Sequence, residues 1–248
     1  MTIYSFLEPV VSKAVPFVDP HLSWVLQAAL LAGLLLLGLG WAVRRKLAAQ
    51  GGGILPDEGL TLRNAAELLV EMLDSQGRAI MGPDYRRYLP IVGTIFMFIL
   101  LSNLMGLVPG LGGATSDVNT TTAWAIISYA VYNAVGIRKH GFWYINQFLG
   151  PSFFEVKLFG KKIHVRLLAP FFFPLEFLLH LARILTLSIR LLANMFADHT
   201  VVAVWLSLVP IAVPAIFLGL GIVVSFLQAF VFALLTMIYI GLALEDAH

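Results

Sequence analysis

The chain has 248 residues, of which 59% are hydrophobic and only 12% are charged. A soluble globular domain carries about 25% charged residues, so this composition indicates an integral membrane protein whose helices satisfy their own backbone hydrogen bonds in lipid. The formal net charge of +2 is too small to indicate a nucleic-acid partner, and the lack of cysteine excludes disulfides, thiolate metal sites and a cysteine nucleophile.

The first half of the chain contains three apolar stretches and one amphipathic stretch. Membrane spans are predicted at residues 22–43, 88–110 and 120–138. The third is short and contains Tyr129 among other polar residues, so we expect it to face protein rather than lipid. Residues 57–81 alternate apolar and charged residues at helical spacing, which predicts an amphipathic helix on the membrane surface. A soluble helical segment is the alternative for this stretch.

The second half consists of a polar loop followed by two very long apolar segments. The cytoplasmic loop is predicted at 139–167, with a short β-hairpin around Gly160. The long segments are predicted at 168–208 and 210–245. A helix needs about 20 residues to cross the hydrocarbon core, so we expect these two to form a long, strongly tilted helical hairpin. The predicted fold is therefore a single all-α membrane domain over residues 1–248, with about five membrane segments plus the amphipathic surface helix.

Basic residues near the span ends predict the orientation of the chain. Seven lie between the first two spans and six between the third span and the first long segment, whereas the opposite side carries only Lys13. By the positive-inside rule, the N-terminus is expected outside and the C-terminus in the cytoplasm. A bacterial plasma (inner) membrane is the expected location, and an organellar inner membrane is the alternative.

Polar residues form one stripe along the first long segment. Successive members are 4, 3, 7, 4 and 4 residues apart, which places them within about 90° of one another on a helix. An arginine at the bilayer centre costs about 2.5–3.5 kcal/mol on insertion scales, so we expect Arg190 to have a function. The alternative is that the charged residues form ion pairs between helices. Few residues could serve as their partners, because the second long segment has no charge before Glu245. The stripe consists of Glu176, His180, Arg183, Arg190, Asn194 and Asp198.

Two stretches of the long segments carry a family resemblance. "LSIRLLANMFADH", followed by "SFLQAFVFALLTMIYIGLALE", closely resembles the helical hairpin of subunit a of rotary F-type ATP synthases. "LLSNLMGLVPG" and "SDVNTTTAWAI" resemble the second and third spans of that family, so the resemblance covers nearly the whole chain in order. In this family, subunit a lies against a rotating ring of c subunits and provides two offset aqueous half-channels to the membrane-embedded carboxylates of the ring.

The resemblance implies roles for individual residues. The family's essential arginine corresponds to Arg190, which faces the ring carboxylate, and a glutamine on the partner helix corresponds to Gln228. A fixed guanidinium does not deprotonate in proteins, so the expected role of Arg190 is electrostatic rather than proton-carrying. The residues expected along the proton path are Asn194, Asp198, His199, Gln228, Asp117, Glu176, Tyr239 and His180.

The chain departs from the family pattern at four positions of the hairpin. His199 stands where many bacterial members carry a carboxylate, and Gly221 where they carry a histidine. Gly221 offers no titratable group, and we expect it to leave space for water. Asp198 replaces a usual glycine, and Ile184 a common proline.

The expected partners are the c-subunit ring, the b subunits of the peripheral stalk, the rest of the synthase and the lipid bilayer. No cofactor, bound metal, nucleic acid or catalytic site of the chain's own is expected, since no nucleotide-binding loop or catalytic constellation occurs in the sequence. A secondary cation/proton antiporter is the alternative function. That class usually shows inverted repeats and broken helices, and neither is evident in this sequence.

Overall fold

The computed structural model consists mainly of helices. It describes residues 20–49, 61–108, 112–141, 154–158, 161–165, 169–208 and 212–245. Some side chains within these ranges, that of Glu176 among them, lie outside the description. Lys13 and the proline-containing stretches 109–111 and 209–211 also lie outside it.

In the described part of the first half of the chain there are four helices and two short 3₁₀ turns. They are α2 (Pro20–Ala49), α3 (Leu62–Met81), η1 (Gly82–Asp84), α4 (Tyr85–Leu107), η2 (Ala114–Ser116) and α5 (Val118–His140). Thr61 caps α3, because its hydroxyl accepts a hydrogen bond of 3.3 Å from the Asn64 backbone amide. Asp117 caps α5 in the same way, with a bond of 2.8 Å from the Asn119 amide. Both bonds satisfy amides that have no partner within the first helical turn.

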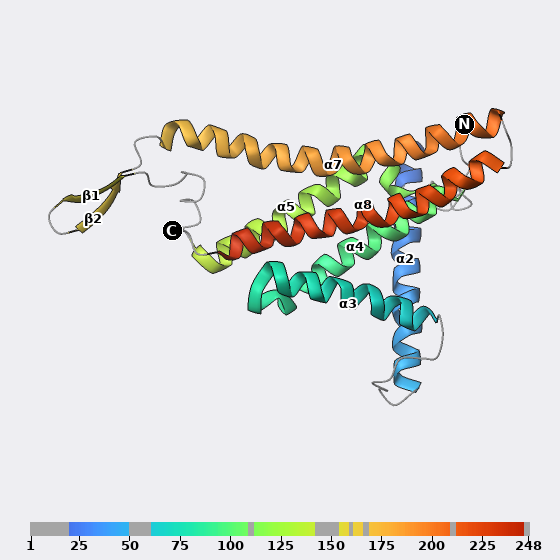
Figure 1. Cartoon of the computed structure of the whole chain (residues 1–248), viewed down its shortest axis with the longest axis horizontal. Coiled ribbons are helices and arrows are strands. Elements are labelled where there is room, and N and C mark those ends of the chain that lie inside the picture. The colour runs from blue at the N-terminus through green and yellow to red at the C-terminus, as the bar shows by residue number, and fades with distance from the viewer. Residues whose placement is uncertain are drawn as a thin grey trace.

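The loop before the long segments contains a β-hairpin. Strand β1 (Phe154–Leu158) pairs antiparallel with β2 (Lys161–Val165), and Val156 lies opposite Ile163. The structure thereby confirms the hairpin predicted around Gly160. The strands lie at one end of the molecule, beyond the start of α7 (Ala169–Leu208) (Figure 1).

Two long helices, α7 and α8 (Ala212–Leu244), form a C-terminal hairpin. They have 40 and 33 residues, which corresponds to about 60 Å and 50 Å at 1.5 Å per residue. They extend along the long axis of the molecule, and α2 runs across that direction (Figure 1). A hydrocarbon core of about 30 Å is too thin for such helices to stand upright. The long C-terminal hairpin expected from the sequence is confirmed.

The core lies between α3, α4, α5, α7 and α8. Its largest buried side chains include Phe96 and Ile99 of α4 and Phe232 and Met237 of α8, each at most 2% exposed. The amphipathic helix α3 adds Leu73 to the same core. One face of α3 is therefore covered by the bundle itself, and Glu71 and Arg78 are exposed on the other side, whereas Arg63 is buried.

Four stretches of the described helices are long and apolar enough to cross a membrane: Trp24–Ala48, Arg63–Leu107, Leu178–Leu208 and Val213–Leu244. Helix α5 is less apolar, which agrees with the polar residues noted in that span, and it packs inside the bundle against α7 and α8. The predicted helical membrane protein with a long C-terminal hairpin is confirmed.

Candidate functional site

Arg190 lies on an uncovered face of α7. Its side chain is exposed, as are those of Thr186 and Ala193 one turn to either side. The neighbouring apolar residues Ile189 and Phe196 are 58% and 70% exposed. Among the described residues, no hydrogen bond or ion pair holds the Arg190 guanidinium. A permanent positive charge in the middle of a membrane helix therefore points away from its own chain.

Asn194 connects α7 to α8 one turn beyond Arg190. Its Nδ2 donates a hydrogen bond of 2.7 Å to Oε1 of Gln228. The Gln228 side chain is only 5% exposed, and its Nε2 has no hydrogen-bond partner within the described structure. Buried amide groups are nearly always satisfied, so this free donor is available to a water molecule or to a group supplied from outside the chain.

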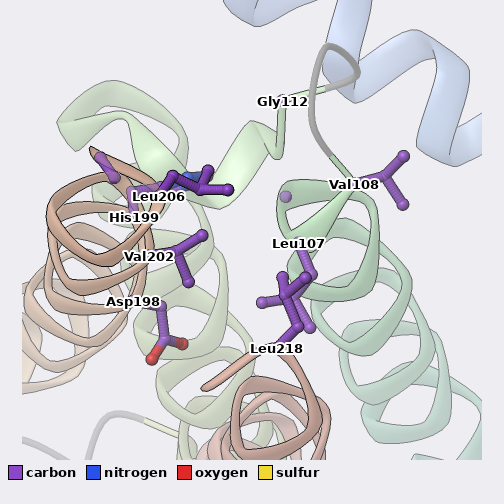
Figure 2. Close-up of a pocket in the computed structure, with 10 residues that line it drawn as sticks. Leu107, Val108, Gly112, Asp198, His199, Val202, Leu206 and Leu218 are labelled. Atoms are coloured by element: carbon purple, nitrogen blue, oxygen red, sulfur yellow. The ribbon is translucent and has the colours of Figure 1, made fainter. Parts of the chain in front are cut away.

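Asp198 and His199 lie beside a cavity of about 150 Å³ between α4, α7 and α8. Figure 2 shows Asp198 and Val202 of α7 across the cavity from Leu107 of α4. A buried water occupies only about 30 Å³ of liquid volume, so the cavity can hold several. The lining residues are Gly106, Leu107, Val108, Gly112, Asp198, His199, Val202, Ala203, Leu206 and Leu218.

Gly221 does not open this cavity, contrary to the expectation from the sequence. A Cβ atom at Gly221 would lie 2.6 Å from Cδ2 of Leu107. The side chain of Leu107 thus occupies the space that was expected to hold water, and that expectation is wrong. The cavity lies instead beside Leu218, about one turn earlier on α8.

His180 and Tyr239 belong to a separate aromatic cluster. His180 is buried, and its ring centroid lies 6.1 Å from that of Tyr132. The Arg183 guanidinium carbon lies 4.2 Å from the Tyr239 ring centroid and 5.6 Å from that of Tyr132, a cation–π arrangement. Arg183 and Arg190 are seven residues apart, which is about 10 Å along the helix, so the cluster is not adjacent to Arg190.

Two other predicted site residues have different surroundings. The Asp117 carboxylate caps α5 and is 8% exposed, so its position is explained by the helix it begins. Its neighbour Ser116 reaches the candidate site, because the Ser116 hydroxyl lies 3.2 Å from Nε2 of His199. The backbone of Glu176 belongs to the first turns of α7, but its side chain lies outside the described part of the structure.

The sequence-based reasoning missed a buried polar network between η2, α4 and α8. The Thr115 hydroxyl donates a hydrogen bond of 2.7 Å to Oδ1 of Asn103, and the Asn103 Nδ2 donates one of 3.4 Å to the backbone carbonyl of Ser225. The Ser102 hydroxyl accepts a bond of 3.2 Å from the Thr115 amide. An asparagine within the otherwise apolar span at 88–110 was the available signal, because a buried amide needs partners.

Buried polar groups also lie between the cavity and the turn of α7 that carries Arg190. His199 contacts Ser116, and the adjacent Thr115 is bonded to Asn103. Asn103 in turn contacts α8 at Ser225, one turn before Gln228. The bond between Gln228 and Asn194 lies one turn farther along α8, next to the turn of α7 that carries Arg190. Polar groups therefore follow one another from the cavity to the uncovered face of α7.

Membrane-length helices that bury polar groups between them and expose an arginine are typical of a multi-pass membrane protein that transports ions. The chain belongs to the ATP synthase A chain family, whose model matches residues 25–241. It is 38% identical to ATP synthase subunit a 1 of Syntrophotalea carbinolica over 87% of this chain and 83% of the relative. It is also 37% identical to ATP synthase subunit a of Bdellovibrio bacteriovorus, over 85% and 87% of the two chains. The chain is thus a membrane subunit of a proton-transporting ATP synthase.

Proposed function

We propose that the chain is the stator proton-channel subunit of the Fo sector, with Arg190 facing the carboxylates of a c-subunit ring. The observation that carries this proposal is the exposed guanidinium on the uncovered face of α7, without a partner among the described residues and one turn from the bond between Asn194 and Gln228. The peripheral-stalk b subunits and the remainder of the synthase are the other proposed partners.

Arg190 acts through its charge in this mechanism. A positive group within about 4–6 Å favours the ionised form of a carboxyl group, so a protonated ring carboxyl that arrives at Arg190 releases its proton. The same charge repels protons that would otherwise cross directly between the two half-channels. Each elementary charge that crosses 100 mV releases about 2.3 kcal/mol, which is available to turn the ring.

The outer half-channel consists of the cavity and the buried polar network. Protons enter beside His199 and Asp198, both of which can bind and release a proton, and move through water held by the network toward Asn194. The unbonded Nε2 of Gln228 supports this proposal, since it is a buried donor with a water or ring group as its natural partner.

The inner half-channel lies at the opposite end of α7. Glu176, His180 and Tyr239 belong to it, and Arg183 is held against the Tyr239 ring at its border. The proposed orientation has the N-terminus outside and the C-terminus in the cytoplasm of a bacterial inner membrane, in agreement with the basic residues at the span ends.

Cross-linking to the ring tests this function. Ala193→Cys places a thiol on the exposed face of α7 beside Arg190, and the chain has no native cysteine to interfere. Oxidation should link it to single cysteines placed near the ring carboxylate of the assembled complex. Ala134→Cys, on an exposed position of α5, is the matched control and should not form the link. Equal linking by the two positions, or none at position 193, contradicts the proposal and favours an antiporter without a ring partner.

A further inference from the structure

Two arginines converge on one tyrosine hydroxyl where α3 turns into α4. Arg78 Nη2 and Arg86 Nε each donate a hydrogen bond of 3.2 Å to the Tyr85 hydroxyl oxygen. Both guanidinium carbons also lie beside the face of that ring, at 5.7 and 5.9 Å from its centroid. These three residues line an open pocket together with Gly82 and Pro83.

The tyrosine is held in place by the core, so the convergence is built into the fold. Tyr85 is 5% exposed and belongs to the main hydrophobic core. Its ring packs over Gly77, where an added Cβ would lie 3.3 Å from Tyr85 Cδ2. Gly82 has a φ of 71°, a conformation that favours glycine, and it makes the tight turn that brings Arg78 and Arg86 together.

The charges at this turn are only partly balanced. Asp74 lies 3.6 Å from Arg78 and is the one carboxylate that forms an ion pair with either arginine within the described structure. Two guanidinium groups that share one acceptor oxygen repel each other, and most of their N–H donors have no partner among the described residues. A tetrahedral phosphate between two guanidiniums removes the repulsion and accepts several charge-assisted hydrogen bonds.

The position of the pocket relative to the apolar part of α4 favours a phospholipid as the source of the phosphate. The apolar part of α4 runs from Tyr88 to Leu107, which is about 30 Å at 1.5 Å per residue and matches the hydrocarbon core. Arg86 lies in the helical turn just before this stretch, where phospholipid phosphates are found. Basic pockets at the ends of membrane helices bind anionic head groups. We propose that Arg78, Tyr85 and Arg86 bind the phosphodiester head group of an anionic phospholipid.

Lipid binding to the purified, delipidated ATP synthase complex tests this site. Labelled dioctanoyl-phosphatidylglycerol should bind to a saturable site with an affinity about tenfold above that of dioctanoyl-phosphatidylcholine, because the two arginines attract the net negative charge of the first lipid and repel the quaternary ammonium of the second. The double variant Arg78→Gln/Arg86→Gln should lose this site. Arg45→Gln is the matched control, since Arg45 is also exposed and lies 5.2 Å from the Trp41 ring but shares no acceptor oxygen with a second arginine.

Tyr85→Phe keeps the ring packing and removes only the shared oxygen, so it tests the site even where the double variant fails to assemble. It should lower the affinity for phosphatidylglycerol severalfold without loss of the subunit from the complex. The proposal is overturned if both lipids bind equally, or if Tyr85→Phe or the assembled double variant binds phosphatidylglycerol as wild type does. Inorganic phosphate that displaces the lipid at equal concentration identifies a free-phosphate site and also overturns it.

Discussion

The side chain of Asn194 on α7 is hydrogen-bonded to that of Gln228 on α8 at 2.7 Å, one helical turn from Arg190. This bond lies between the two long helices at the level of the exposed guanidinium. A hydrogen bond between the helices at this level favours one register of α7 against α8 and one placement of the turn that carries Arg190. The backbone that carries Arg190 is therefore supported by a neighbouring hydrogen bond. The Arg190 side chain itself has no hydrogen-bond or ion-pair partner among the described residues.

Arg190→Ala should abolish ATP synthesis and ATP-driven proton pumping while the complex still assembles, because the side chain is exposed and forms no hydrogen bond or ion pair among the described residues. It should also raise the passive proton permeability of the membrane, since the charge between the proposed half-channels is gone. Arg190→Lys should fail to restore coupling, because an ammonium lacks the planar fork of a guanidinium. Acidification of inverted vesicles measures both effects. Substantial pumping by Arg190→Ala vesicles contradicts the proposed mechanism.

Asn194→Leu should destabilise the hairpin, because it leaves the buried Gln228 amide without its bonded partner. Loss of a partner from a buried polar group costs about 1–3 kcal/mol. The expected readout is a lower thermal midpoint for the purified complex, together with slower proton pumping. Asn194→Gln, which keeps an amide, should retain more of both than Asn194→Leu does. Identical midpoints for wild type and Asn194→Leu would show that the bond does not brace the helices.

Asn103→Leu should slow proton pumping more than its effect on stability explains, because Asn103 bridges Thr115 and α8 along the proposed outer path. Ser128→Ala is the matched control. Ser128 is a buried polar residue that bonds Thr236 at 2.9 Å, away from this path. Asn103→Leu loses two buried hydrogen bonds and Ser128→Ala loses one, and only Asn103→Leu should lower the rate of pumping per assembled complex. Equal rates of proton pumping for the two variants would show that Asn103 contributes only to packing.

The polar stripe and the hairpin could be predicted from the sequence because both depend on local periodicity. Arg190 and Asn194 are four residues apart, so a helix places them on one face wherever it packs. The space beside Gly221 could not be predicted, because it depends on how α4 crosses α8 and on the placement of Leu107. The contact between Asn103 and Thr115 was missed for a similar reason, since η2 folds back against the end of α4.

Gly221→His should destabilise the complex when it is introduced alone, because its side chain enters the space filled by Leu107. Overpacking of this kind costs about 1–3 kcal/mol. Adding Leu107→Ala should relieve the clash and recover part of the thermal midpoint. The two substitutions are in contact, so their effects should not add. Additive changes in the midpoint would show that Leu107 does not occupy the space beside Gly221.

His199→Ala should slow proton translocation strongly without uncoupling it, in contrast to the loss of Arg190. The imidazole lies beside the cavity and 3.2 Å from the Ser116 hydroxyl, and an imidazole can both bind and release a proton. His199→Glu should restore part of the rate, because a carboxylate also carries a proton. ATP-driven acidification of inverted vesicles from pH 6 to 9 provides the measurement. Ser116→Ala, which removes only the contact to the imidazole, should change the rate less than His199→Ala. If His199→Ala vesicles match wild type throughout this range, His199 is structural and Asp198 or water alone passes the entering proton.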